Sequence, residues 1–131
     1  MPQIGPLVPL WTFCIVLVAM ALKHFVADFA LQPKWIAHGK ERREGWLAPL
    51  ALHAFGHAVL TLCVVLVVAP HLWWLALADF VVHAAIDRGK TLIAQRGGWC
   101  VDKAGFWWLL GFDQFLHQVT NVAIVAALFT L

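Results

Sequence analysis

The sequence predicts an all-α protein, a four-helix transmembrane bundle built from two parallel helix-pair repeats. Three observations support this fold class. The 131 residues are 63% hydrophobic and only 12% charged, whereas soluble proteins carry about 25% charged residues. Four apolar segments are each long enough to cross a hydrocarbon core of about 30 Å, which takes roughly 20 helical residues. Each segment also carries one pair of His or Asp side chains spaced by four residues.

The first helix is expected from Pro6 to Gln32. Pro33 ends it, because the residue before a proline avoids the helical region of backbone space. The opening stretch MPQIGPLVPL has no basic region. We therefore interpret the first apolar run as a retained helix and not as a cleaved signal peptide. The polar loop WIAHGKERREG follows this helix.

The other three helices complete a single membrane domain, residues 1–131. The second helix is expected from Trp46 to Ala69 and the third from His71 to Gln95, with a tight turn at Pro70 between them. The loop GGWCVDK then leads to a fourth helix from Ala104 to Leu131.

The distribution of basic residues predicts the orientation of these helices. All nine basic residues except Lys23 lie in or beside two loops on one side of the bundle. The positive-inside rule makes that side cytoplasmic, so both termini are expected outside. Lys23 lies inside the first span, where it has to snorkel to the interface or face a polar interior.

Four pairs of potential metal ligands are the strongest functional signal in the chain. A spacing of four residues places both members of a pair on one face of a helix. An ionisable group inside a bilayer costs at least a few kcal/mol, so eight of them indicate a shared polar site. The pairs are His24/Asp28, His53/His57, His83/Asp87 and Asp113/His117.

The alternating directions of the helices sort these eight side chains into two layers, about 6 Å apart. The four residues nearer the cytoplasm are Asp28, His53, Asp87 and Asp113. The four deeper residues are His24, His57, His83 and His117. The first two helices also map onto the last two with an offset of 59 to 60 residues. An even number of spans separates equivalent helices, so the repeats are parallel, with their axis along the membrane normal.

Imidazole and carboxylate groups together suit a divalent metal, with zinc as the first expectation and iron or manganese as alternatives. Five His and three Asp match two ions, or one ion with carboxylates that orient the histidines. The alternative is a metal-free network of His–Asp hydrogen bonds that joins the helices. Asp79, one turn before His83, is expected to support the site or to have a purely structural role.

Three further polar residues are candidates for substrate binding. Gln114 adjoins Asp113, and Gln32 lies at the end of the first span. Lys90 follows Asp87 by three residues and could neutralise an anionic group such as a phosphate, although a role as a topology or headgroup anchor is also open. The net charge of +2 gives no indication of nucleic-acid binding.

The segments KHFVADFALQPKWIAHGK, LHAFGH, VVHAAIDRGK and FDQFLHQ resemble a bacterial family of small integral membrane proteins of unknown function. This resemblance implies a location in the bacterial inner membrane. More distantly, the His-x3-Asp pairs are similar to those of membrane-bound metal-dependent hydrolases, which in turn resemble the all-helical zinc phospholipase C and nuclease fold. The second resemblance implies hydrolysis.

The sequence therefore predicts a metal-dependent hydrolase at the cytoplasmic face, acting on a phosphoester or a lipid-linked substrate. Asp113 or Asp28 would serve as general base. The alternatives are a di-iron or haem redox centre, a transporter or sensor of divalent ions, and a purely structural protein. We expect membrane lipid and a small-molecule or lipid-linked substrate as partners, no nucleic acid, and a monomer or homodimer.

Overall fold

The computed structural model describes residues 8–131, and the regular elements of this part of the chain are all helices, without strands. The expected start of the first helix at Pro6 lies outside the described residues. The elements, in chain order, are α1 (Leu10–Phe25), the π-helical turn η1 (Val26–Ala30), α2 (Lys34–Gly39), α3 (Leu47–Val68), the 3-10 turn η2 (Pro70–Leu72), α4 (Trp74–Gly97) and α5 (Ala104–Thr130).

The described range contains five α-helices where the sequence predicts four, because the first loop contains the short helix α2. Pro33 explains both the end of one element and the start of the next. Its backbone is extended, with φ −65° and ψ 161°, so the preceding helix cannot continue through it. Its carbonyl then accepts hydrogen bonds from the N–H groups of Ile36 and Ala37, which begin α2.

The other helix ends differ from the predicted ones by a few residues. The first segment ends in a π turn, in which the N–H of Leu31 bonds to the carbonyl of Val26 at 3.0 Å. The 3-10 turn at Pro70–Leu72 delays the start of α4 to Trp74. At its other end α4 continues to Gly97, because Gly98 adopts the left-handed conformation, with φ 59°, that commonly ends a helix.

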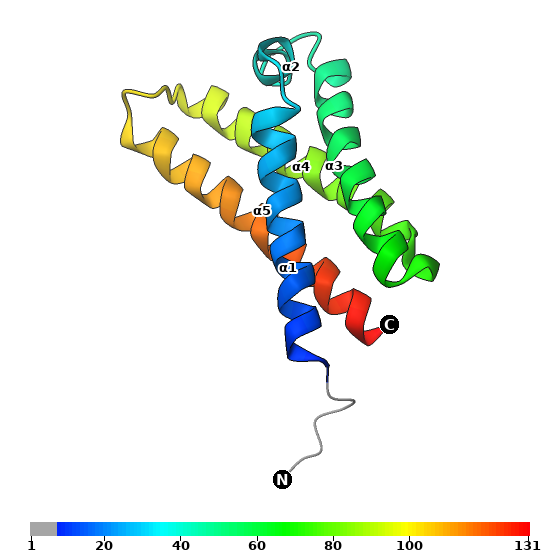
Figure 1. The fold of residues 1–131 in the computed structure, drawn as a ribbon. Coiled ribbons are helices and arrows are strands. Elements are labelled where there is room, and N and C mark those ends of the chain that lie inside the picture. The colour runs from blue at the N-terminus through cyan, green and yellow to red at the C-terminus, as the bar shows by residue number, and fades with distance from the viewer. Residues whose placement is uncertain (1–7) are drawn as a thin grey trace.

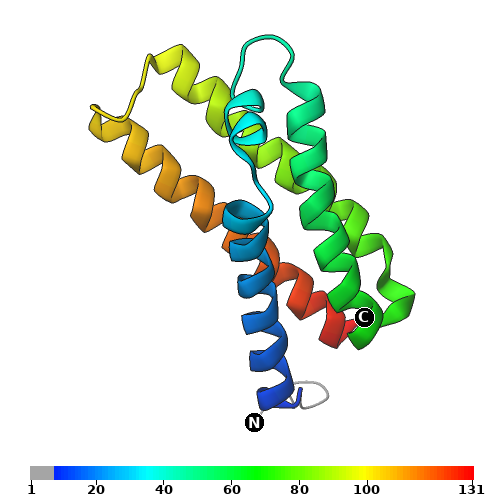
Figure 2. The same ribbon diagram turned by 45° about the horizontal axis from the view of Figure 1, so that its top comes forward.

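The four long helices pack in the cyclic order α1, α3, α4, α5, with α5 returning to contact α1. The start of α1 and the C-terminus lie at one end of the bundle, and α2 lies at the opposite end (Figure 1, Figure 2). The apolar core fills the end near the C-terminus and includes the buried side chains of Met20, Val65 and Val125. The buried His and Asp side chains lie outside this core, toward α2.

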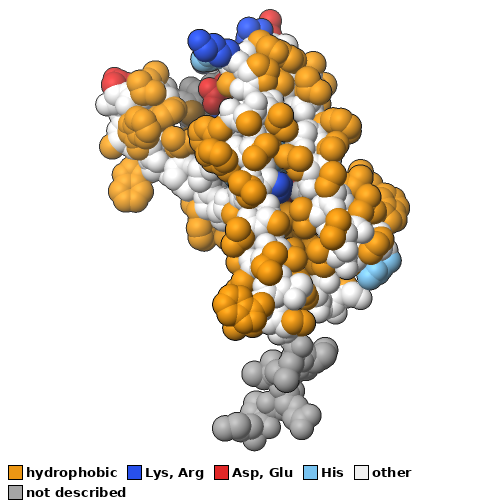
Figure 3. All heavy atoms as spheres, in the orientation of Figure 1, with side chains coloured by type: hydrophobic (Ala, Val, Ile, Leu, Met, Phe, Trp, Pro, Cys, Tyr) orange, Lys and Arg blue, Asp and Glu red, His pale blue; other side chains and the backbone are white. Residues whose placement is uncertain are grey.

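Large apolar side chains cover the outside of the bundle, and Lys and Arg gather near α2 (Figure 3). Trp11, Val67 and Trp108 are each at least 80% exposed. By length and composition, two helical segments of the described range could cross a membrane, Leu10–Ala30 and Leu47–Val68. The prediction of four spans is thus met by this criterion in α1 with η1 and in α3, but not in α4 or α5.

Candidate metal centre

All eight predicted ligand residues converge in the middle of the bundle. One pair comes from each of α3, α4 and α5, and the fourth comes from α1 together with η1. Asp28 has a side chain that is 15% exposed. The other seven residues are at most 4% exposed: His24, His53, His57, His83, Asp87, Asp113 and His117.

Four imidazole rings, one from each long helix, form a closed cycle. The ring of His57 stacks on that of His83, with centroids 3.7 Å apart, and His83 stacks on His117 at 4.2 Å. His24 closes the cycle, with centroids 5.0 Å from His57 and 5.1 Å from His117. These are the four residues that the sequence assigns to the deeper layer.

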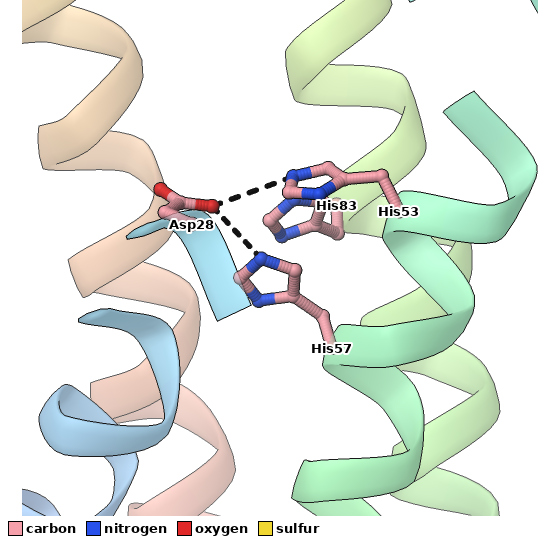
Figure 4. Close-up of side chains that lie close together, drawn as sticks. All are labelled: Asp28, His53, His57 and His83. Atoms are coloured by element: carbon pink, nitrogen blue, oxygen red, sulfur yellow. Dashed lines mark hydrogen bonds and ion pairs between the residues drawn. The ribbon is translucent and has the colours of Figure 1, made fainter. Parts of the chain in front are cut away.

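Asp28 lies close to three histidines from two helices, and Figure 4 shows two of them, His53 and His57, beside it. His57 donates from Nε2 to Oδ1 at 3.0 Å, and His24 Nε2 lies 3.1 Å from Oδ2. His53 Nε2 lies 3.4 Å from Oδ1. Asp28 belongs to the π turn, which widens the helix locally by one residue per turn. Such turns frequently occur at functional sites, where they alter the direction of a side chain.

Asp87 is the corresponding carboxylate on α4, and it has a partner that the sequence analysis missed. His117 donates from Nε2 to Oδ1 at 3.0 Å. Lys40, directly after α2, donates from Nζ to Oδ2 at 2.6 Å and is itself buried. His53 Nε2 lies between the two carboxylates, 3.4 Å from Asp28 and 3.5 Å from Asp87, without a hydrogen bond to either.

The third carboxylate, Asp113, has more free capacity than the other two. Its Oδ2 accepts a hydrogen bond from Gln114 Nε2 at 3.1 Å, and its Oδ1 lies 3.5 Å from His117 Nε2 without forming a hydrogen bond. The Gln114 carbonyl oxygen in turn lies 3.4 Å from His24 Nε2. Gln114 therefore connects α5 to α1.

The donor set fits a divalent metal. Within residues 8–131, three groups of side chains bring their ligand atoms to within 4.8 Å of one another. They are Asp28/His53/His57/His83, His24/His83/His117 and Asp87/Asp113/His117. A tetrahedral zinc ion with bonds of about 2.0–2.1 Å needs ligand atoms roughly 3.3 Å apart, so small side-chain rotations suffice.

Unpaired atoms point to the same place. In the part of the chain that the structure describes, five buried side-chain atoms lack a hydrogen-bond partner. Four belong to the predicted ligands, namely His53 Nε2, His57 Nδ1, His83 Nε2 and Asp113 Oδ1. Since buried polar atoms are nearly always satisfied, this concentration in one cluster matches a site that holds an ion.

A cavity of about 260 Å³ adjoins the centre on the side of α2. The three predicted substrate-binding residues, Gln32, Lys90 and Gln114, all line it together with Asp28, Asp113 and Lys40. Gln32 donates from Nε2 to the carbonyl of Asp28 at 3.1 Å, and its own carbonyl oxygen is unpaired. Lys90 Nζ lies 3.3 Å from Glu41 at the mouth.

Asp79 lies on the opposite side of the histidines, and its contacts are with Lys23 and Thr61. Its Oδ2 accepts hydrogen bonds from Lys23 Nζ at 2.9 Å and from Thr61 at 2.5 Å. In the described range Asp79 has no hydrogen bond or ion pair with His83. Lys23 is 6% exposed and faces this polar interior, which is one of the two possibilities that its position allows.

Comparison with known proteins identifies a family but no activity. No curated protein and no solved structure matches this chain. One family, described as a protein of unknown function, matches residues 16–131, a range that includes all four ligand pairs. Because the match covers most of the chain, the protein belongs to this family, DUF3307.

Proposed function

We propose that this protein is a membrane-embedded, metal-dependent hydrolase that acts on a phosphoester or lipid-linked substrate. The observation that carries the proposal is the convergence of eight His and Asp side chains, seven of them almost fully buried, from four helices. The group Asp28/His53/His57/His83 suits zinc, and the group Asp87/Asp113/His117 suits a second ion. Iron and manganese accept the same donors.

The proposal places all four long helices across a membrane, although α4 and α5 are less apolar than α1 and α3. The polar residues that lower their hydropathy, such as Asp79, Asp87 and Asp113, are buried inside the bundle. Most of their outward side chains are apolar, including Val81 on α4 and Phe115 on α5, although Gln118 on α5 is also exposed. Charged groups inside a membrane protein characteristically face the bundle interior, so average composition underestimates such helices.

Contacts within the centre support the two-repeat arrangement. Asp28 bonds to His57, 29 residues later, and Asp87 bonds to His117, 30 residues later, both at 3.0 Å. Under the same offset the stacked pair His57/His83, with centroids 3.7 Å apart, corresponds to His117/His24, a tilted pair at 5.1 Å. A pseudo-twofold axis through the histidine cycle accounts for both relations. Lys23 and Lys40 have no basic counterparts at this offset, so the two halves have different environments.

The cavity beside the candidate metal centre supports hydrolysis, because a substrate and water can reach the ligands through it. A divalent ion bound here would supply a water acidified to near neutral pH. The general base would be whichever of Asp113 and Asp28 does not bind metal; both line the cavity, and Oδ1 of Asp113 is unpaired. Lys90 and Gln114, on the cavity wall, are placed to bind and orient an anionic substrate group.

The far side of the centre is closed. Beyond the Lys23–Asp79 pair, the apolar core contains Met20, Val65 and Val125, each 0% exposed. An ion would therefore have to pass through close-packed hydrocarbon to leave on that side. This arrangement favours a site that exchanges substrate through the cavity near α2 over a transport path.

Elemental analysis of the purified protein tests the metal, and phosphoester turnover tests the reaction. We expect one or two equivalents of zinc, iron or manganese in the wild type, and loss of metal in His57→Ala and Asp87→Ala. His71→Ala, an exposed histidine in η2, is the control and should retain the wild-type metal content. Chelation should abolish hydrolysis, and metal should restore it.

Each negative result has a defined meaning. Folded wild-type protein without metal would leave the His–Asp pairs as hydrogen bonds between helices and would overturn the proposal. Bound metal without hydrolysis of phosphoesters or lipids would refute the reaction alone. A coloured, redox-active iron centre would replace hydrolysis by oxidative chemistry.

A further inference from the structure

We infer that the opening between α4 and α5 binds the apolar tail of a membrane lipid whose phosphate-bearing head group lies at Lys90. This inference rests on the proposed function and deepens it, because it assigns the substrate class and the route from the bilayer. The argument begins with Lys90, which lines three neighbouring cavities.

The three cavities differ in polarity. The first is the polar cavity of about 260 Å³ at the metal centre. The second, of about 310 Å³, lies between the C-terminal end of α4 and the start of α5 and includes Ala94, Trp99 and Phe106. The third, of about 410 Å³, lies on the outer side of the same two helices and includes Ile93 and Phe112. Apolar space thus meets polar space at Lys90.

The third cavity also contains Asp113, a predicted ligand of the metal. A molecule in this cavity would therefore contact the membrane-facing surface of α4 and α5 while one end reached the metal centre. Figure 1 and Figure 2 both show α4 and α5 as neighbours joined by the 98–103 connection, which lies away from α3. This separation of polar and apolar space fits an amphiphile whose head group lies at the candidate metal centre and whose tail lies along α4 and α5.

The charges at Lys90 favour an anionic head group. Lys90 is paired with Glu41, at 3.3 Å, and the Glu41 side chain is 50% exposed. Because the Glu41 carboxylate is solvent-exposed, a bound anion can replace it at Lys90. A lysine ammonium is a common phosphate ligand. The stem of Lys90 extends the apolar wall toward Ile93 and Leu109.

The third cavity forms a groove between α4 and α5, and this groove has free space at Gly89. A Cβ atom built at this residue has no neighbouring heavy atom within 4 Å, and Ala85 lies one turn before it on the same wall. A larger side chain at Gly89 would therefore fill the groove without displacing another part of the protein. Gly56 on α3 has the same free space but lines none of the three cavities, so it provides a matched control.

The test is photocrosslinking of a phosphatidic acid with a diazirine in its acyl chain, in nanodiscs of phosphatidylcholine. Crosslinks should concentrate on α4 and α5 around Gly89 and Phe112, and unlabelled phosphatidic acid should compete for them. We expect Gly89→Leu and Lys90→Gln to reduce the specific crosslinks at least severalfold, and Gly56→Leu to leave them unchanged. Glycerol phosphate, which has the head group alone, should compete poorly.

Three results would overturn the inference. They are crosslinks spread evenly over all outward helix faces, full retention in Gly89→Leu, and competition by glycerol phosphate as strong as that by phosphatidic acid. A dimer that dissociates in Gly89→Leu would instead assign the groove to a second copy and would also overturn it. The readout requires no turnover, so the experiment is run on chelated and metal-loaded protein. Failure of lipid binding with metal present would leave the hydrolase proposal standing.

Discussion

Lys40 and Asp87, 47 residues apart, form a buried ion pair of 2.6 Å at the edge of the candidate metal centre. The ammonium group occupies one oxygen of a carboxylate whose other oxygen accepts a hydrogen bond from His117. Asp87 is therefore neutralised by a residue of the protein itself. Lys40 lies at the end of α2, so the position of this short helix affects the charge balance of the centre.

Replacement of Lys40 should strengthen metal binding. In Lys40→Gln the metal no longer competes with an ammonium group for Asp87, so we expect affinity to rise about tenfold, or about 1.4 kcal/mol. The metal-free variant should be less stable, because a buried carboxylate has lost its cation. Competition with a chelating dye measures the affinity, and Lys34→Gln, at an exposed residue, is the control. Weaker binding in Lys40→Gln would show that Lys40 orients the carboxylate instead.

Asn substitutions should distinguish one ion from two. Asp28 and Asp87 belong to separate groups of candidate ligands. If the centre holds two ions, Asp28→Asn and Asp87→Asn should each lose about one equivalent, because a neutral amide is a much poorer ligand. Asp102→Asn, in the exposed loop, should lose none. Loss of all metal in both variants would identify a single shared ion.

The Lys23–Asp79 pair should stabilise the fold without holding metal. Removal of one partner leaves an uncompensated buried charge, so Lys23→Met or Asp79→Leu should each cost about 3–5 kcal/mol of unfolding free energy. The double variant should be more stable than the sum of the two losses predicts, since no charge remains. Denaturation in mixed micelles measures this, and metal content should stay at the wild-type level. Additive losses would contradict a direct interaction.

Gly39 should be required for the docking of α2. A Cβ atom there would lie 2.6 Å from Cγ of Pro49, at the start of α3. Gly39→Ala should therefore cost about 1–3 kcal/mol and displace Lys40. Thermal unfolding measures the loss, with Gly56→Ala, which has free space, as the control. A loss of stability no larger than that of Gly56→Ala would show that α2 can shift away from Pro49 without destabilising the protein.

The three cysteines provide a test of the proposed topology. Cys14 and Cys63 lie on the outer surface of α1 and α3, and Cys100 lies in the loop before α5. A charged maleimide should modify Cys100, and only from the cytoplasmic side of membrane vesicles. Cys14 and Cys63 should react only after detergent exposes them. Labelling of Cys100 from the outside would reverse the orientation.

Much of the candidate site was predictable because helical periodicity determines which side chains share a face. The spacing of His24 and Asp28, repeated with variations on three other helices, brought all eight ligands to one place. The grouping of the four deeper histidines in one layer followed from the alternating directions of the helices alone. The coarse all-α class followed from composition and segment length.

The missed features depend on long-range contacts or on backbone irregularity. Nothing around Lys40 in the sequence indicates that it reaches Asp87, because this requires α2 to fold back over the bundle. In the π turn that contains Asp28, a backbone hydrogen bond spans five residues instead of four. The spacing of apolar and polar residues does not indicate such a change. Asp79 lies on the predicted face of its helix, but its ion-pair partner is Lys23, which lies 56 residues earlier on α1.

The separation of Lys23 and Asp79 along the chain has a consequence for biosynthesis. The ribosome completes α1 well before α4, so for most of synthesis the lysine has no acidic partner. A lone charge at the centre of a span costs about 2.5–3.5 kcal/mol on translocon-based scales. In the proposed membrane-embedded protein, the first helix would carry this cost until α4 is made. The Lys23–Asp79 pair would then couple the assembly of the two halves.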